Sequence, residues 1–269
     1  DDRSPAYWRK RRTGMSTYCT ATVINHKEIV PGVWKMELAA PEIAKTARPG
    51  QFIQLYPPDE RNLLARPISL SSISKMSVTI VYRVVGKGTK QFSCLQVDDM
   101  VHVMGPLGNG FTLLDAGTQN VIVGGGLGIP PLLELAKRLH GNTVVLLGYQ
   151  DDPFMAEDFQ RLGLEVHIAS QSGNYGFHGN VLDMLKNITF PVGQIFACGP
   201  RQMLQSVSMW AKEHNVPIQV SLEERMACGL GACLGCGVKI QKHGEQDWRY
   251  LRVCKDGPVF SGEEVVWNG

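Results

Sequence analysis

The stretch VIVGGGLGIPPLLELAKRLH, residues 121–140, predicts the architecture of the second half of the chain. It begins as an apolar run that leads into glycines, which is typical of a buried strand that ends in a tight turn. It continues with apolar residues at helical spacing, and Pro130 and Pro131 stand where a helix can begin. The stretch therefore predicts one strand followed by one helix.

The same alternation continues to residue 224. Strand-like apolar runs occupy residues 143–150, 164–170, 194–200 and 218–224, and helix-like segments separate them at 155–163, 181–187 and 201–215. Strands that alternate with helices predict βαβ units and a parallel sheet. We therefore assign residues 116–224 to an α/β domain.

The first half of the chain has a different rhythm. Short runs rich in Val, Ile, Tyr and Thr are separated by Pro and Gly, and they lie at residues 20–26, 33–40, 51–56 and 77–85. Such runs without a long helical period predict an antiparallel β-barrel or sandwich, which we place at residues 15–115. Residues 1–14, DDRSPAYWRKRRTG, are polar and basic, and we expect a processed or added extension without ordered structure.

The composition sets the broad class. The chain has 269 residues, of which 43% are hydrophobic and 19% charged, and its formal net charge is +2. These values predict an ordinary globular protein of about two domains with a small appendage, and they give no argument for a nucleic-acid partner. No window reaches eighteen consecutive apolar residues, so we expect no membrane span.

Four of the seven cysteines lie in the last sixth of the chain, which we assign to a small domain at residues 225–269. Cys228, Cys233, Cys236 and Cys254 have the spacing C-x4-C-x2-C-x17-C, which is the plant-type spacing for a 2Fe-2S cluster. Glycines between them allow backbone N–H groups to approach the sulfurs. Structural zinc stays open as an alternative, although its ligands usually come as two closely spaced pairs such as C-x2-C.

The distribution of the cysteines does not fit a secreted disulfide scaffold. A metal or cluster site in a reducing compartment fits better, so we expect a cytoplasmic location. We predict that Cys19, Cys94 and Cys198 are small buried hydrophobic residues.

Two stretches of the first domain carry candidate ligand contacts. Arg66 and Ser69, held by Pro67, could clamp a diphosphate, although a solvated surface arginine is the simpler interpretation. Arg83 and the turn that ends in Gly88 and Thr89 could form a second patch against a phosphate or a flavin ring.

The second domain carries two more. GGGLGIPP, residues 124–131, lies between a strand and a helix, where backbone amides could receive a phosphate, but it lacks the third glycine of the dinucleotide fingerprint. A tight structural turn stays equally open. The tripeptide CGP, residues 198–200, closes a strand at the edge of the sheet where α/β folds bind ligands. Asp151 and Asp152 follow the second strand, and with no arginine nearby they would repel the extra phosphate of NADPH, although two solvated loop aspartates explain them equally well.

Together these motifs resemble the ferredoxin-reductase superfamily. The segment EERMACGLGACLGCGV at 223–238, followed by VCKDGPVF at 253–260, is similar to one of its families, the electron-transfer subunits of class 1B dihydroorotate dehydrogenases. The resemblance covers nearly all of residues 15–269. It implies an oxidoreductase with a β-barrel FAD-binding domain, an α/β NAD-binding domain and a 2Fe-2S cluster domain.

The resemblance also implies site residues and a partner. FAD would be bound by Arg66, Pro67, Ile68, Ser69, Val81, Tyr82, Arg83, Gly88 and Thr89. NAD(H) would be bound by Gly124, Gly125, Gly126, Gly128, Ile129, Pro130, Cys198, Gly199 and Pro200, and the cluster by the four tail cysteines. The family works with a catalytic subunit that carries FMN and oxidises dihydroorotate in pyrimidine biosynthesis, as a heterotetramer with two copies of each subunit.

Two alternatives stay open. One is a free-standing reductase that passes electrons to a ferredoxin, an oxygenase or a bifurcating enzyme, which would share the motifs but not the FMN subunit. The other is a zinc-stabilised binding module without a redox role.

Overall fold

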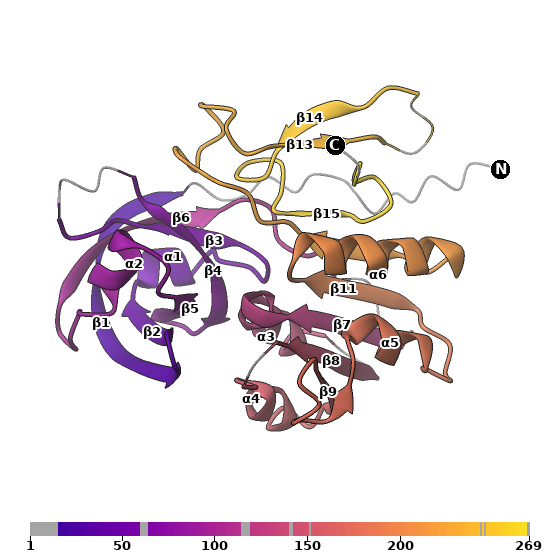
Figure 1. The fold of residues 1–269 in the computed structure, drawn as a ribbon. Coiled ribbons are helices and arrows are strands. Elements are labelled where there is room, and N and C mark those ends of the chain that lie inside the picture. The colour runs from indigo at the N-terminus through magenta and orange to yellow at the C-terminus, as the bar shows by residue number, and fades with distance from the viewer. Residues whose placement is uncertain are drawn as a thin grey trace.

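A computed structural model describes residues 16–59, 64–113, 119–139, 142–150, 152–242, 244 and 246–267. The extension predicted at residues 1–14 lies outside the described residues, as does the predicted domain boundary between residues 115 and 116. Three parts of the chain are visible in Figure 1: a barrel, a sheet flanked by helices, and a C-terminal segment that lies along the top of both.

The first part is a closed antiparallel barrel of six strands in the order β1-β2-β5-β4-β3-β6. The strands are β1 (Thr17–Val30), β2 (Val33–Ala39), β3 (Phe52–Leu55), β4 (Arg66–Ile73), β5 (Ser77–Arg83) and β6 (Met100–Leu107), with short helices α1 (Pro41–Ala44) and α2 (Lys87–Phe92) between them. Closure leaves no unpaired strand edge. The barrel predicted from the short strands is therefore confirmed.

Alternation along the strands decides which side chains fill the barrel. On β3, Ile53 and Leu55 are fully buried in the barrel core with Leu70 and Ile80. Phe52, on the other face of the same strand, packs in the core that lies under the sheet and the C-terminal segment. β3 is therefore buried on both faces, which places it between the barrel and the rest of the molecule.

The second part is a seven-stranded sheet in the order β10-β9-β8-β7-β11-β12-β15. Its strands are β7 (Asn120–Gly125), β8 (Thr143–Tyr149), β9 (Glu165–Ser170), β10 (Phe177–His178), β11 (Gln194–Cys198), β12 (Ile218–Ser221) and β15 (Val259–Ser261). Neighbouring strands are parallel except β12 and β15. The predicted parallel sheet is confirmed, and the sequence prediction missed β10 and β15.

Helices cover this sheet as the alternation predicts. They are the 3-10 helix η2 (Gly126–Gly128), α3 (Pro130–Ala136), α4 (Ala156–Gln160), α5 (Val181–Lys186) and α6 (Arg201–Glu213). α3 begins at Pro130, where the sequence places a helix start. The chain runs from β7 outward through β8 and β9 and then returns to β11 on the other side of β7. β7 and β11 therefore flank the switch point at which open α/β sheets bind ligands.

The third part begins after β12 and contains the hairpin of β13 (Gly237–Ile240) and β14 (Arg249–Arg252). Beyond the hairpin, β15 returns to the sheet and pairs with β12. The C-terminal segment therefore shares a strand with the α/β sheet, and the predicted boundary between residues 224 and 225 stays a prediction.

Buried polar contacts join the barrel to the sheet. The Glu134 carboxylate on α3, 2% exposed, accepts the backbone N–H of Ile73 from β4 at 2.9 Å. Gln219 on β12 accepts the N–H of Thr112 at 2.9 Å and donates to its carbonyl at 2.8 Å. Because unpaired buried polar groups are costly, these contacts fix how the two parts meet.

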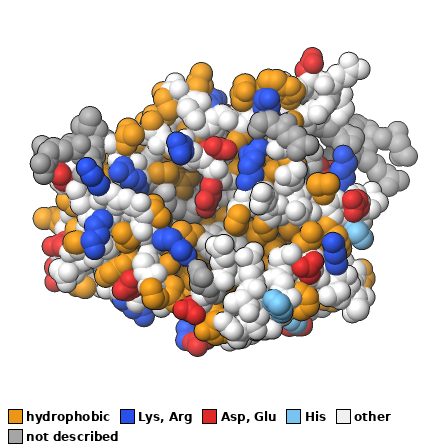
Figure 2. Space-filling view, viewed as in Figure 1, with side chains coloured by type: hydrophobic (Ala, Val, Ile, Leu, Met, Phe, Trp, Pro, Cys, Tyr) orange, Lys and Arg blue, Asp and Glu red, His pale blue; other side chains and the backbone are white. Residues whose placement is uncertain are grey.

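The surface carries both signs of charge. In Figure 2, lysine and arginine side chains are interspersed with acidic ones over the visible face, which agrees with the small net charge. Within the part of the chain that the structure describes, no helix is both long and apolar enough to cross a membrane.

The three cysteines outside the tail differ in burial. Cys198 is buried on β11, as predicted. The prediction is wrong for Cys94, which is exposed just after α2, and Cys19 is only half-buried. The Cys94 thiol instead donates to the carbonyl of Lys90 in the last turn of α2, at 3.3 Å.

Candidate functional site

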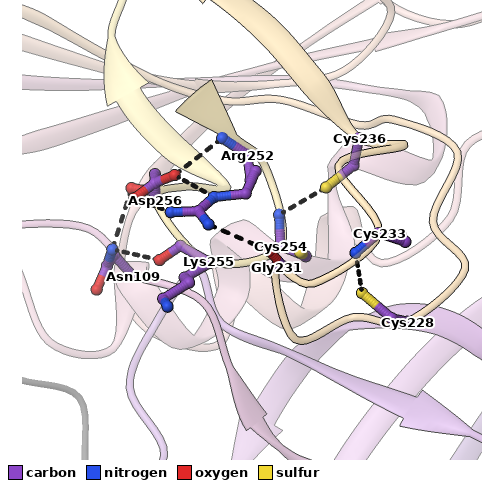
Figure 3. Close-up of polar contacts among 9 residues, drawn as sticks. All are labelled: Asn109, Cys228, Gly231, Cys233, Cys236, Arg252, Cys254, Lys255 and Asp256. Carbon is purple, nitrogen blue, oxygen red and sulfur yellow. Dashed lines mark hydrogen bonds and ion pairs between the residues drawn. The ribbon is translucent and has the colours of Figure 1, made fainter. Parts of the chain in front are cut away.

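The four tail cysteines lie in two pairs. Cys228 and Cys233 share one loop, and the backbone N–H of Cys233 donates to the Cys228 sulfur at 3.5 Å. The second pair joins Cys236 to Cys254, which follows β14, and the backbone N–H of Cys254 donates to the Cys236 sulfur at 3.4 Å (Figure 3). No three His, Cys, Asp or Glu side chains among the described residues converge on a single metal position.

This paired arrangement tests the predicted cluster. A 2Fe-2S cluster has two irons, each of which takes two thiolates, whereas zinc needs four ligands around one ion. Two separate cysteine pairs on adjoining segments therefore fit the cluster better than they fit zinc.

Backbone N–H groups surround one of the sulfurs. The Cys228 sulfur accepts hydrogen bonds from the N–H groups of Leu230 at 3.4 Å and Cys233 at 3.5 Å. The loop reaches this shape through left-handed φ angles at Gly229 (68°), Gly231 (79°) and Leu234 (61°). Such donors stabilise negative charge on a ligating sulfur and on its cluster.

The two pairs differ in electrostatics. Burial alone would raise the pKa of the Cys228 thiol, but hydrogen bonds from the backbone of Cys233 and Leu230 and from the Cys233 thiol lower it to about 6. Burial, followed by the neighbouring Cys236 thiol, raises the pKa of Cys254 to about 12. The loop therefore favours the thiolate form at Cys228 over that at Cys254.

An ion pair between Arg252 and Asp256 supports the cysteine loop. The Arg252 guanidinium donates to Asp256 at 2.9 Å and to the carbonyl of Gly231 at 3.1 Å. Asn109, which follows β6 of the barrel, donates to the carbonyls of Lys255 and Asp256, both at 3.0 Å (Figure 3). Sequence reasoning missed these residues, although Asp256 and Arg252 flank the fourth cysteine.

The predicted FAD residues of the barrel come partly together. Arg66 on β4 lies against α2, because a Cβ added to Gly88 would be only 2.7 Å from its Nη2 atom. The Thr89 hydroxyl accepts the N–H groups of Val85 at 2.9 Å and Gly86 at 3.1 Å, so its side chain closes the turn before α2. A guanidinium beside the first turn of a helix fits the diphosphate of FAD.

The other barrel residues lie along β4 and β5. Pro67 and Ser69 are half-buried, Ile68 and Val81 are buried, and Arg83 is exposed. Tyr82 is 3% exposed and its hydroxyl lies 2.9 Å from His26 Nε2, so its side chain belongs to the barrel core, and burial raises its pKa. Only the backbone of Tyr82 remains available to a ligand.

The predicted NAD residues meet at the switch point. The glycines of residues 124–128 end β7, and residues 198–200 end β11 beside them. A Cβ on Gly128 would lie 2.3 Å from the carbonyl carbon of Cys198, so the two loops are in direct contact. A Cβ on Gly126 would meet no atom within 4 Å. This open side at the strand ends fits a bound nucleotide.

Individual side chains near the switch point have structural roles. Cys198 is 1% exposed, and burial raises the pKa of its thiol. Its side chain is therefore part of the core, as the sequence predicts for this cysteine. Ile129 is fully buried, and Pro130 begins α3.

A cavity of about 600 Å³ opens beyond the end of β8 and is lined by Asp152, Phe154 and Tyr175. The Asp152 carboxylate accepts a hydrogen bond from the Tyr175 hydroxyl at 3.0 Å. Asp151 lies outside the described residues. The expectation that no arginine stands nearby is wrong, because Arg161 lines the same cavity, although it is paired with Glu157 at 2.8 Å.

Sequence reasoning also missed Gln54 on β3. Its side chain is fully buried, and neither of its amide atoms has a hydrogen-bond partner. The signal was a polar residue inside the apolar run FIQLY, residues 52–56, on the face of the strand opposite to Ile53 and Leu55.

Comparison with known proteins agrees with this geometry. Residues 223–266 match the family described as the iron-sulfur cluster binding domain of dihydroorotate dehydrogenase B. A solved structure of an NADH-dependent reduced ferredoxin-NADP oxidoreductase is 29% identical with a TM-score of 0.83, and the match covers 92% of this chain and 90% of that one. A ferredoxin reductase of carbazole 1,9a-dioxygenase, 18% identical with a TM-score of 0.64 over 76% of this chain and 69% of that one, shows the same fold.

Two curated relatives match over almost their whole length. A protein of Caldanaerobacter subterraneus is 38% identical over 92% of this chain and 98% of its own, and one of Streptococcus mutans is 39% identical over 91% and 96%. Both are named dihydroorotate dehydrogenase B (NAD(+)), electron transfer subunit. This chain therefore belongs to the family of electron transfer subunits of dihydroorotate dehydrogenase B.

Proposed function

We propose that this chain carries electrons from the FMN of a dihydroorotate-oxidising catalytic subunit to NAD+, by way of a 2Fe-2S cluster and FAD. Dihydroorotate loses two electrons and two protons in becoming orotate, and NAD+ takes up both electrons with one of the protons as a hydride. Bound FAD exchanges hydride with a nicotinamide and single electrons with an iron–sulfur cluster. The observation that carries this function is the presence of paired cysteines, a barrel and a glycine-lined switch point on one chain.

The residues of the chain divide the work. The two cysteine pairs would hold the cluster, with backbone N–H groups at Cys228 to offset its negative charge. Arg66, lying against Gly88, would hold the diphosphate of FAD. Residues 124–128 and 198–200 would receive NAD(H) on the open side of Gly126. No side chain of this chain is needed as a general acid or base, because that chemistry belongs to the catalytic subunit.

The test is a matched pair of cysteine variants in the complex with a candidate FMN subunit. Cys233→Ser should lose the visible absorbance of the cluster and the dihydroorotate-dependent reduction of NAD+, while FAD and its reduction by NADH remain. Cys94→Ser, a change at another exposed cysteine, should retain all three. A colourless wild-type protein that contains zinc and no iron would favour the zinc-stabilised module instead.

The catalytic subunit is proposed to dock over the exposed cysteine loop. Cys233 is exposed, and the apolar side chains of Leu230 and Leu234 beside it are 51% and 66% exposed. Exposed apolar side chains around a redox site are typical of a partner surface. Leu234→Lys should weaken co-elution with the FMN subunit, and Leu162→Lys, a change at a leucine that is 39% exposed after α4, should not. Light scattering of the wild-type complex should give two copies of each subunit.

NADH is proposed as the preferred nucleotide because a carboxylate at Asp152 would repel the phosphate of NADPH, and the nearby Arg161 is already paired with Glu157. Asp152→Ser should therefore raise the rate with NADPH relative to NADH, measured as reduction of bound FAD. An unchanged preference would mean that Asp152 does not contact the nucleotide. A cytoplasmic location is part of the same proposal, since the four cysteines need a reducing compartment to stay available to a metal.

A free-standing reductase is the second candidate, and the 29% identity to an NADH-dependent reduced ferredoxin-NADP oxidoreductase favours it. The two candidates separate in one assay. Rapid reduction of several acceptors by this chain alone, with no orotate formed when FMN subunits are added, would favour the second.

A further inference from the structure

Gln54 is buried without any hydrogen bond. Its exposure is 0%, and neither its Oε1 nor its Nε2 atom has a partner. Among the buried side chains that the structure describes, it alone leaves two polar atoms unpaired. Buried amides in native proteins are nearly always hydrogen-bonded, so a partner outside the protein is indicated.

Gln51, just before β3, shows that the protein can satisfy a buried glutamine in this region. Gln51, 2% exposed and three residues earlier, donates to the carbonyl of Gly108 at 2.7 Å and accepts the N–H of Arg48 at 2.8 Å. Both of its partners are backbone groups. Gln51 is therefore a structural residue. Gln54 has the same side chain, but no protein group satisfies its amide.

Gln54 lies between the two proposed redox sites. On one side of β3 it is paired in register with Pro67 on β4, the strand that also carries Arg66 and Ser69. Above it lies the cysteine loop, because a Cβ on Gly229 would be 2.6 Å from Gln54 Nε2. The orange C-terminal loop passes close to the barrel strands in Figure 1. Gly229 directly follows Cys228, so the amide of Gln54 is adjacent to the backbone that wraps the first cysteine.

We propose that the Gln54 side chain would donate an N–H hydrogen bond to an inorganic sulfide of the cluster held at Cys228, and that this bond raises the reduction potential of the cluster. This inference rests on the function proposed above. Reduction adds negative charge to the centre, and an N–H donor stabilises the charged form. The backbone donors at Cys228 come from the cysteine loop, whereas Gln54 adds a donor from the barrel, so its amide would couple the barrel to the cluster.

The test compares Gln54→Met with Gln51→Met in the complete complex. Methionine has a similar length and no polar end, so both variants keep the packing and remove the amide. The cluster's midpoint potential is measured by spin-resonance titration. Gln54→Met should lower it, so that the ratio of reduced to oxidised cluster at a fixed potential falls about tenfold, a shift of about 59 mV for a one-electron couple.

The melting temperatures of the two variants should differ in the opposite way from their cluster potentials. Gln51→Met removes two bonds to protein and should lower the melting temperature of the cofactor-free chain, while leaving the cluster potential unchanged. Gln54→Met removes no protein hydrogen bond and should not lower that melting temperature.

Two results would overturn the inference alone. One is a Gln54→Met variant with a wild-type cluster potential, whatever its melting temperature. The other is a shift in the flavin potential with none in that of the cluster. Absence of the cluster signal from the wild-type complex would instead overturn the proposed function, and this inference with it.

Discussion

The loops at residues 124–130 and 228–237 are both rich in glycine, but they need it for different reasons. At Gly128 the requirement is space, because a Cβ would lie 2.3 Å from the backbone carbon of Cys198. At Gly231 the requirement is also conformation, because φ is 79° and the carbonyl must face Arg252. The first loop brings two strand ends together, and the second bends backbone N–H groups around a sulfur.

The difference teaches that glycine content alone does not describe a ligand loop. At Gly128 the first loop needs the absence of a Cβ, and this loop lies between elements of the sheet domain. The cysteine loop depends on positive φ angles, which most residues avoid, and it belongs to a segment held by side-chain hydrogen bonds. Alanine substitutions can therefore separate the two kinds of requirement.

Gly128→Ala should have the largest effect. Neither backbone in contact can move without disturbing β7 or β11, so the free energy of unfolding should fall by about 3 kcal/mol or more. Chemical denaturation followed by circular dichroism measures this, and NADH binding should be lost at the same time. A variant with wild-type stability would show that the two loops separate more readily than their contact indicates.

Gly231→Ala should have a smaller and more local effect. The left-handed conformation costs an alanine about 1–2 kcal/mol, and the added Cβ would press on Lys255, whose Cδ would be 2.6 Å away. Iron and sulfide per chain should fall, while NADH binding stays at the wild-type level. An equal loss of cluster iron and of NADH binding would contradict the idea that the two loops have independent requirements.

Gly235→Ala should have the smallest effect. Its φ angle is not left-handed, and the nearest atom to an added Cβ is the Cys233 sulfur at 3.7 Å, an ordinary contact. The free energy of unfolding should change by less than about 0.5 kcal/mol, and iron content should match wild type. A large loss of iron here would mean that this glycine, and not only Gly231, is required by the cluster itself.

Much of the fold could be predicted because local pattern and tertiary structure agree. The alternation after residue 120 predicts β7, α3 and the following strands, since each helix must cover the apolar face of a parallel sheet. The cysteine spacing predicts a two-iron site, because the gaps themselves reflect which sulfurs can share a loop.

The remaining features depend on contacts between distant segments. β15 has only three residues, and only the free edge of β12 makes it a strand. Cys94 is exposed because α2 ends at Phe92, before this cysteine. The apolar character of the surrounding residues does not reveal where that helix ends. The same holds for Gln54, whose importance depends on Gly229, 175 residues later in the sequence.

Because β12 pairs with β15, the cysteine-bearing segment begins and ends at neighbouring points of the sheet. The N–H of Leu222 donates to the carbonyl of Pro258 at 2.9 Å, so the chain leaves and re-enters the sheet at one place. Segments whose two ends already touch are the ones that chains accept as transplants with little strain. An engineer could therefore move residues 222–258 as a cassette onto the corresponding edge of a reductase that lacks a metal centre.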